Sequence, residues 1–393
     1  MRRTGSSAGV LVVLLLSVRG VGFAHHGAGT FDLSSSVKFA GKLTAIELIN
    51  PHSWLYFEAP DKNGKIGKYR CEMRSLHVLR RSGWTKDLFP IGQKVQIEAS
   101  PDRADPNSCY LQTILFENGS RMDRYGQYVK GPKGAITEIR GPLVTPSAKR
   151  EPRRPTGEPN IAGDWAQEQR VMADPRGVGG GLVPLSQIAQ TPPAGARAGG
   201  AAGGGAAAAG PRLYNGTELT EAGTQAVAAF VARTDNPRFQ CQTTSIIFDW
   251  VFDGAVNRIT QSKDTIGIQY GQFNLKRTIH LNLKQHPSNI KPSRAGHSIG
   301  RWDGDVLVVD TVGFLPGVLN APVPNSDKLH VVERFTLDPK TLLLARNYEA
   351  DDVVYLKGKY TGSDVVQVAD VPYAPERCKE QQFMDYSKEQ AKR

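Results

Sequence analysis

The chain has 393 residues, enough for two hydrophobic cores of ordinary domain size, and a formal charge of +11 at neutral pH. Beyond its amino-terminal segment no apolar run is long enough to cross a bilayer as a helix, so we expect no transmembrane span in the mature protein. Residues 121–160 carry nine Lys or Arg against four Asp or Glu, with few aromatic residues, and we expect no nucleic-acid partner.

The first 24 residues have the three parts of a secretory signal peptide. Met1-Arg2-Arg3 is a short positive start, the run from Val10 to Val18 is apolar except for Ser17, and the segment closes on a small residue, Ala24. The apolar run is too short to span a membrane. We therefore interpret residues 1–24 as a signal peptide and expect a periplasmic or secreted protein.

Two histidines follow the predicted cleavage point. Cleavage after Ala24 would give His25 a free α-amine. This amine and the His25 imidazole could bind Cu(II) together, with a second imidazole from His26, His52 or His77 as the third ligand. Cleavage one residue earlier would place a histidine third in the chain, which binds Cu(II) together with backbone nitrogens. A polar spacer without metal is the alternative. One hypothesis is thus a copper site that includes His25, His26 and His52.

Residues 25–120 have the element order of an OB-like, five-stranded β-barrel. Strands are predicted at 37–48, 52–58, 66–73, around 95–99 and at 109–116. A short helix over 75–81 falls between the third and fourth strands, with Ser75 able to cap it and Gly83 able to end it. The resulting order, β-β-β-α-β-β, is typical of an OB fold.

Two segments are expected to lie outside the folded domains. Residues 121–160 are basic and contain Pro and Gly, which indicates a linker. Residues 175–211 are rich in Gly and Ala, and those from 194 to 210 are almost wholly so. Because such a composition has nothing to bury, we interpret 175–211 as a low-complexity insertion in the second domain.

Residues 161–393 are predicted to form a second antiparallel β-barrel or sandwich with one helix. The helix covers 219–233, where Thr217 or Thr220 can cap it. Short strands separated by turn residues recur about every ten residues, as in barrels and sandwiches. They are expected at 245–251, 256–261, 266–270, 276–281, 305–312, 328–337, 342–349 and 353–359. The fold class is therefore mainly β.

The four cysteines are Cys71, Cys109, Cys241 and Cys378. An oxidising compartment favours disulfides, and four cysteines allow three pairings. The simplest pairing joins Cys71 to Cys109 and Cys241 to Cys378, with one bond in each domain. No CxxC pair is present, so neither a thioredoxin-type nor a zinc-ribbon site is expected.

Residues suited to acid–base chemistry gather in the second domain. Asp303-Gly304 predicts a hairpin turn, with His297 and Arg301 before it and Asp305 and Asp310 after it. The candidates for catalysis are His297, Asp305 and Glu333, and His286, His330 and Arg334 enlarge the set. On one strand His330 and Glu333 would point to opposite faces. A hairpin with charged edges and no catalysis is the alternative.

Several short motifs resemble known sequences. Ala24-His25-His26, Asn50-Pro51-His52-Ser53-Trp54-Leu55, Arg81-Ser82-Gly83-Trp84 and Gly92-Gln93-Lys94-Val95 resemble an exported bacterial family, domain of unknown function 6152, over residues 24–120. Over residues 240–393 the chain resembles hypothetical exported bacterial proteins. This second resemblance rests on Gly296-His297-Ser298-Ile299-Gly300-Arg301-Trp302, on residues 305–311, and on His330-Val331-Val332-Glu333-Arg334-Phe335. Neither resemblance implies an activity or a catalytic residue.

Because the sequence holds no recognised catalytic motif and two barrel-like domains, we expect a non-enzymatic binding protein for a small ligand, with copper as a candidate. Two alternatives stay open. One is a hydrolase- or lyase-type enzyme that acts through the second β domain, and the other is an envelope assembly or interaction protein.

Overall fold

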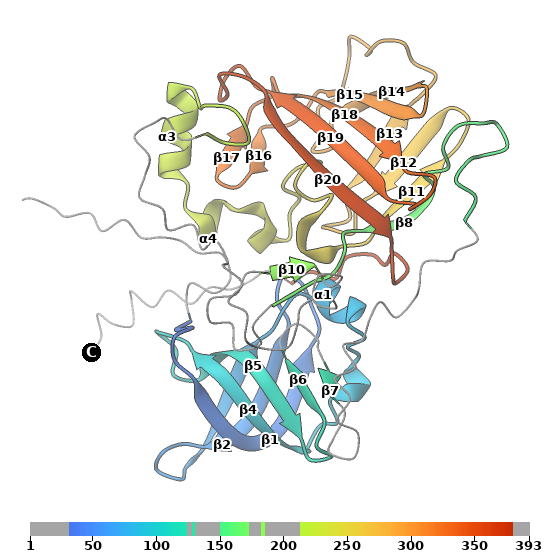
Figure 1. The fold of residues 1–393 in the computed structure, drawn as a ribbon. Coiled ribbons are helices and arrows are strands. Elements are labelled where there is room, and N and C mark those ends of the chain that lie inside the picture. Colours follow the sequence, from blue (N-terminus) through green and yellow to red (C-terminus); the bar gives the residue numbers. More distant parts are fainter. Residues whose placement is uncertain (1–30, 124–127, 130–149, 173–181, 185–212, 380–393) are drawn as a thin grey trace, which may run out of the picture.

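The computed structural model describes residues 31–123, 128–129, 150–172, 182–184 and 213–379. The predicted signal peptide, His25, His26 and most of the Gly/Ala insertion lie outside these residues. The described chain is mainly β, as predicted, and forms two closed barrels that lie one above the other in Figure 1.

The first barrel has the predicted OB-like arrangement. Its strands are β1 (Val37–Glu47), β2 (Trp54–Pro60), β3 (Ile66–Glu72), β4 (Lys94–Pro101) and β5 (Ser108–Phe116). Neighbours pair in the order β3-β2-β1-β4-β5, and a parallel pairing of β3 with β5 closes the barrel. Helix α1 (Leu76–Arg81) lies between β3 and β4 in sequence, and the Ser75 hydroxyl accepts a hydrogen bond from the Val78 N–H at its start.

Alternating apolar residues fill this barrel. Leu55 and Phe57 of β2 and Ile97 of β4 are buried, while the residues between them are more exposed, as a half-buried strand requires. Cys71 and Cys109 face each other in register across the parallel seam and form a disulfide. This bond therefore fastens the two strands that close the barrel.

The sheet continues past the predicted end of the domain. Strands β6 (Arg121–Asp123) and β7 (Tyr128–Val129) add to the edge of β5, and a turn of 3₁₀ helix, η1 (Lys86–Leu88), precedes β4. The start of the segment expected to be a linker is thus strand. Residues 130–149, the middle of that segment, lie outside the described residues.

The second barrel has nine strands. They are β8 (Gly163–Ala166), β11 (Asn257–Gln261), β12 (Thr265–Gln269), β13 (Lys276–His280), β14 (His297–Asp303), β15 (Val306–Val312), β18 (His330–Leu337), β19 (Leu344–Asp351) and β20 (Tyr360–Val368). They pair in the order β11-β12-β13-β14-β15-β18-β19-β20-β8 and close on β11. All neighbours are antiparallel except β13 and β14, which the connection 281–296 joins in parallel.

Shorter elements complete the second domain. Strands β9 (Arg170–Met172) and β10 (Leu182–Pro184) pair with each other, as do β16 (Gly317–Asn320) and β17 (Val323–Asn325). The helical elements are α3 (Glu221–Ala229), α4 (Ala232–Asp235), η2 (Pro237–Gln240) and η3 (Phe252–Gly254). Thr220 caps α3 by accepting a hydrogen bond from the Gly223 N–H.

Three sequence predictions for this domain were wrong in detail. The single helix over 219–233 is two helices, because α3 ends at Ala229. Residues 245–251 form turns instead of a strand, since the Ser245 hydroxyl and carbonyl accept hydrogen bonds from the N–H groups of Phe248 and Asp249. Residues 353–359 also turn, because Asp352 accepts from following backbone N–H groups, and strand β20 starts only at Tyr360.

Charged side chains occupy the interior of the second barrel. Arg277 Nη2 lies 2.5 Å from Glu333 Oε2, and Arg346 bridges the other Glu333 oxygen at 3.1 Å and Asp364 at 2.6 Å. Arg277 also donates to Ser298 and Thr311, and Arg346 to the carbonyls of Ile246 and Ile247. Buried charges are tolerated when they are paired and hydrogen-bonded in this way.

The two barrels are joined by ion pairs, one of them buried. Arg81, at the end of α1, donates from Nε to Asp370 Oδ1 at 2.7 Å, and both side chains are almost fully buried. Arg74 lies 2.5 Å from Asp253, again across the junction. The helix α1 of the first barrel therefore serves as the contact element between the two domains (Figure 1).

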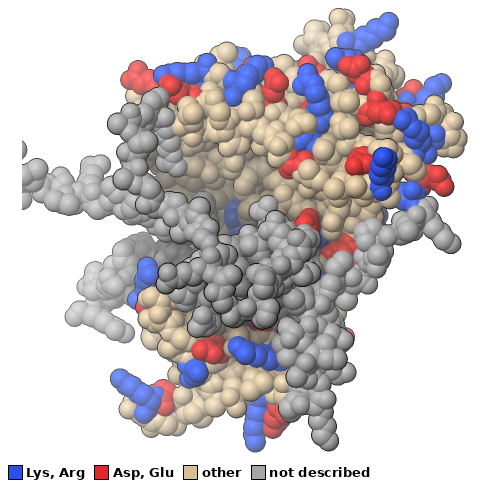
Figure 2. Space-filling view, viewed as in Figure 1, with Lys and Arg blue, Asp and Glu red and all other residues tan. Residues whose placement is uncertain are grey.

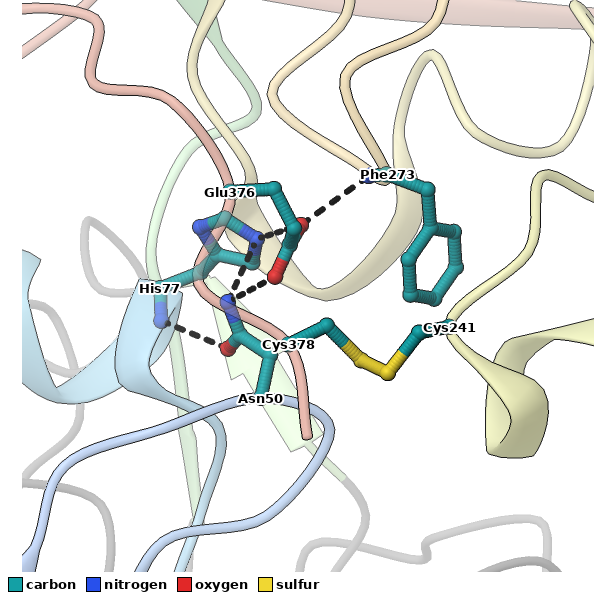
Figure 3. Close-up of a disulfide and its surroundings, with 6 residues drawn as sticks. All are labelled: Asn50, His77, Cys241, Phe273, Glu376 and Cys378. Atoms are coloured by element: carbon teal, nitrogen blue, oxygen red, sulfur yellow. Dashed lines mark hydrogen bonds and ion pairs between the residues drawn. A yellow bond between two sulfur atoms is a disulfide. The ribbon is translucent and has the colours of Figure 1, made fainter. Parts of the chain in front are cut away.

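The segment after β20 fastens the same junction (Figure 3). Cys378 forms a disulfide with Cys241 of the second domain, and the backbone on both sides of Cys378 exchanges hydrogen bonds with Asn50 of the first. Glu376 Oε1 accepts a hydrogen bond from Asn50 Nδ2, while Oε2 accepts one from the Phe273 N–H and lies 3.0 Å from His77 Nε2. Both disulfides thus have the simplest predicted pairing.

The surface carries charge of both signs. Figure 2 shows Lys and Arg interspersed with Asp and Glu on the visible face of both barrels. In the part of the chain that the structure describes, no helix has both the length and the apolar character needed to traverse a lipid bilayer.

Candidate functional site

Five adjacent strands of the second barrel place polar, titratable side chains in one row on its outer face. The row, with one further histidine from the connection 281–296, is here called the histidine–aspartate stripe. It consists of His280 (β13), His286, His297 (β14), Asp310 (β15), His330 (β18) and Asp351 (β19). Strand alternation explains the row, because the neighbouring residues Ser298, Thr311 and Val331 are buried inside the barrel.

His286 links the first half of the stripe. Its Nδ1 lies 2.8 Å from Nδ1 of His297, and its Nε2 lies 3.0 Å from Asp310 Oδ1. The His280 ring stacks on His297, with centroids 5.2 Å apart and planes inclined by 14°. The side chain of His286 keeps 18% of its surface exposed, so solvent reaches this pair.

His330 links the second half. Its Nε2 lies 3.2 Å from both oxygens of Asp310, and its Nδ1 lies 3.4 Å from Asp351 Oδ2. Lys359 donates to the same Asp351 oxygen at 2.9 Å. The side chains of His330, Asp310 and Asp351 are each about one-third exposed, so the stripe is open to water along its length.

The hydrogen bonds fix the tautomers of the first half when both rings are neutral. A carboxylate only accepts, so His286 donates to Asp310 from Nε2 and its Nδ1 has a free lone pair. His297 must then donate to that lone pair from its own Nδ1. This leaves Nε2 of His297 with a lone pair, in a chain of hydrogen bonds in which His297 donates to His286 and His286 donates to Asp310.

The pKa values agree with these protonation states. Burial, together with the nearby rings of His286 and His280, lowers the pKa of His297 below its usual value. Burial alone would raise the pKa of Asp310, but hydrogen bonds from His286 and His330 outweigh it and hold the pKa below its usual value. Near neutral pH His297 is therefore a neutral imidazole, with its one proton on Nδ1, and Asp310 is a carboxylate.

The three predicted catalytic residues do not share a site. His297 lies in the stripe. Asp305 is exposed at the hairpin turn and pairs with Arg153 at 2.5 Å, whereas Glu333 is fully buried between Arg277 and Arg346 inside the barrel. As expected, His330 and Glu333 of one strand lie on opposite faces of the sheet.

The predicted copper ligands are only partly described. His25 and His26 lie outside the described residues. His52 Nδ1 lies 2.6 Å from Glu72 Oε1 near the domain junction, and His77 contacts Glu376. Within the described ranges, no three His, Cys, Asp or Glu side chains are grouped as a ready-made metal site.

Sequence reasoning found His286, His297, Asp310 and His330 but missed His280 and Asp351, and it did not bring the set together. Each of the three motifs in the second half contributes one stripe residue and at least one buried residue: His297 with Ser298, Asp310 with Thr311, and His330 with Glu333. That period-two alternation was the available signal. Nothing in the sequence placed His286, because it lies in a connection without repeating pattern.

Comparison with known proteins bears on the first barrel. Residues 12–109 match the model of a family of unknown function (DUF6152). The match confirms the resemblance expected for this part of the chain. It extends from the predicted signal peptide into β5, so the histidine–aspartate stripe lies wholly outside the DUF6152 match. The resemblance of residues 240–393 to exported bacterial proteins stays a prediction.

No curated protein matches the chain, and no solved structure does.

Proposed function

We propose that the protein is an exported binding protein that holds a Cu(II) ion between His286 and His297. The observation that carries the proposal is the approach of two imidazole nitrogens, Nδ1 to Nδ1, at 2.8 Å on a face that water reaches. Neutral imidazole is a common ligand of transition metals, and the lowered pKa of His297 keeps its ring neutral.

The number of available ligands favours Cu(II) over Zn(II). The 2.8 Å between the two nitrogens is the length of their N–H···N hydrogen bond and selects no metal by itself. Zinc usually takes three or four protein ligands. Because the described residues offer no group of three, two imidazoles with water in the other positions fit the tetragonal ion better.

Asp310 is the orienting partner in this proposal. Metal-binding histidines usually donate their second ring N–H to a carboxylate, which fixes the tautomer and the ring orientation. His286 donates from Nε2 to Asp310, so its Nδ1 lone pair already faces His297. A bound ion would take the place of the shared proton, and the His297 proton would move to its Nε2.

The sequence and the disulfides support an extracytoplasmic location for the proposed binding protein. The signal-like residues 1–24 and the two disulfides both fit an oxidising, extracytoplasmic compartment. We propose the periplasm or the exterior of the cell as the location.

A Cu(II) titration of the secreted chain tests the proposal. The background carries His25→Gln and His26→Gln, so that the amino terminus does not compete. We expect one ion per chain, with an affinity about tenfold or more weaker in His286→Gln and His297→Gln. His52→Gln removes an imidazole outside the stripe and should bind as its parent does. Equal binding by all variants, or loss only in His52→Gln, would overturn the assignment.

The series of hydrogen bonds from His297 through His286 to Asp310 favours a second function. Asp310, His286 and His297 form a relay that ends in the Nε2 lone pair of His297, as a general base requires. The corresponding hypothesis is a hydrolase with His297 as its base. Turnover of chromogenic esters or glycosides that resists a chelator and disappears in His297→Gln would favour the enzyme over the copper-binding protein.

A further inference from the structure

We propose that the Cys241–Cys378 disulfide is a redox switch, which a dithiol reduces selectively and whose reduction releases the last described segment of the chain from the domain junction. This segment, residues 374–379, is here called the strap. It lies against both barrels at their junction (Figure 3). The switch does not depend on the copper site proposed on the second barrel.

The two disulfides differ in their access to solvent. Cys71 and Cys109 are 0% and 1% exposed at the seam of the first barrel, whereas Cys241 and Cys378 are both partly exposed at the junction. In thiol–disulfide exchange a thiolate must reach one sulfur of the bond, so the rate depends on access. A dithiol in solution therefore reaches Cys241–Cys378 and is kept from Cys71–Cys109.

The exchange balances with the dithiol as the reductant. One thiolate of the dithiol attacks a sulfur of the Cys241–Cys378 bond, forms a mixed disulfide and releases the other cysteine as a thiolate. The second sulfur of the dithiol then attacks the first in this mixed disulfide and releases the remaining cysteine. The two protein sulfurs gain two electrons and the two thiol protons, and the dithiol becomes a disulfide.

Apart from the disulfide, polar contacts hold the strap. Each of its residues is at least partly exposed, and none belongs to a hydrophobic cluster of the described chain. The preceding segment differs, because Ala369 and Val371 are buried in such a cluster and Asp370 forms the buried pair with Arg81. Segments with few buried apolar contacts open while the rest of a fold stays intact. Reduction should therefore release the strap and leave residues 369–373 in place.

The strap covers polar groups of both domains. Asn50 of the first barrel is 1% exposed, and its backbone N–H and carbonyl pair with the strap on the two sides of Cys378. The Glu376 carboxylate accepts a hydrogen bond from the Phe273 N–H of the second domain and lies 3.0 Å from His77 Nε2 of the first. Release of the strap would leave all of these groups to water. Reduction is thus expected to uncover a polar surface that both domains share.

Timed alkylation of the full chain tests which bond is reduced first. The protein is incubated with dithiothreitol, free thiols are trapped with iodoacetamide, and mass spectrometry measures the labelled fraction of each cysteine. We expect Cys241 and Cys378 to be labelled at least about tenfold faster than Cys71 and Cys109. Comparable rates, faster reduction of Cys71–Cys109, or no reduction of Cys241–Cys378 would each overturn the proposal.

Hydrogen exchange of the partly reduced parent chain tests the release of the strap. The Asn50 and Phe273 N–H groups donate to the strap, so their exchange should become at least about tenfold faster once the bond is cleaved. Leu43 of the first barrel and Ala369, just before the strap, donate to other carbonyls and are the controls, with unchanged exchange expected. Unchanged exchange at Asn50 and Phe273 would mean that the strap stays bound, and faster exchange at the controls would mean general unfolding. Either result would contradict the switch.

The double variant Cys241→Ser, Cys378→Ser removes the bond without a reductant. It should reproduce the fast exchange of the Asn50 and Phe273 N–H groups and the slow exchange of the two controls. Exchange equal to that of the oxidised parent at all four positions would contradict the switch. Because the alkylation and the first exchange experiment use the parent chain, they decide the question even where this variant does not fold.

Discussion

Arg81 of the first barrel and Asp370 of the second meet in a buried ion pair, with Nε 2.7 Å from Oδ1. Asp370 also accepts a hydrogen bond from Gln169, and Arg81 donates to the Gly254 carbonyl. The sequence predicted two domains joined by a linker at 121–160 and did not predict this contact between them. The ion pair makes the junction between the barrels part of the folded core.

Asp370→Asn should destabilise the protein strongly. The substitution leaves the Arg81 guanidinium buried without its counter-charge, which costs about 3–5 kcal/mol in comparable buried pairs. Urea unfolding followed by circular dichroism measures the change. Asp305→Asn breaks the exposed pair with Arg153 and is the control, with no measurable change expected. Equal effects of the two substitutions would show that the junction pair is not part of the core.

Glu333→Gln should destabilise the second barrel at neutral pH, and the difference should shrink in acid. Burial alone would raise the pKa of Glu333, but Arg277 and Arg346 hold it below its usual value. A carboxyl whose pKa is lowered by folding contributes stability above its unfolded pKa, about 4.5, which is lost as the pH falls through the folded value. Unfolding free energies at pH 7 and below pH 4 test this. A difference that stays constant with pH would contradict it.

Asp249→Asn should stabilise the protein at neutral pH, in contrast to Glu333→Gln. Burial raises the pKa of Asp249 well above its usual value, so the ionised group is a burden on the folded state at neutral pH. Its Oδ2 accepts from the Thr244 N–H, a hydrogen bond that an amide oxygen preserves. We expect Asn to stabilise the protein at pH 7 and to lose this advantage below about pH 3.8, where the carboxyl is neutral in both the folded and the unfolded state. Denaturant midpoints at the two pH values measure it, and a destabilised Asn variant at pH 7 would refute the argument.

Asp310→Asn tests the orienting role proposed for that carboxylate. An amide in its place no longer enforces donation from His286 Nε2, so the Nδ1 lone pair is no longer directed at His297. Cu(II) affinity should fall about tenfold to a hundredfold while the stoichiometry stays at one ion per chain. The same titration in the His25→Gln, His26→Gln background measures it. An unchanged affinity would remove Asp310 from the site.

Much of the fold was predictable because local patterns agreed with it. In the first barrel alternating apolar residues, the Ser75 cap and the order of elements gave five strands and one helix close to their observed bounds. In the second domain the errors fall where Ser245 and Asp352 bind neighbouring backbone N–H groups. These local hydrogen bonds replaced the expected strands with turns, a competition that apolar spacing does not reveal.

The candidate site was predictable as a list of residues but not as an arrangement. His297, Asp310 and His330 each alternate with a buried residue, which places them on the outer face of their strands. Their assembly depends on β14, β15 and β18 being neighbours although β16 and β17 intervene in sequence. The position of His286 depends on the path of a long connection, which no local pattern encodes. Glu333 had the chemistry of a catalyst, but its two arginine partners come from other strands of the sheet.

Pulsed electron paramagnetic resonance of the Cu(II) complex tests the central claim most directly. It is measured on the chain with His25→Gln and His26→Gln, and it reports the imidazoles bound to the ion. We predict coupling from two imidazoles in this background and from one in either His286→Gln or His297→Gln. A spectrum without imidazole coupling, or one that neither substitution alters, would contradict the copper site on the second barrel.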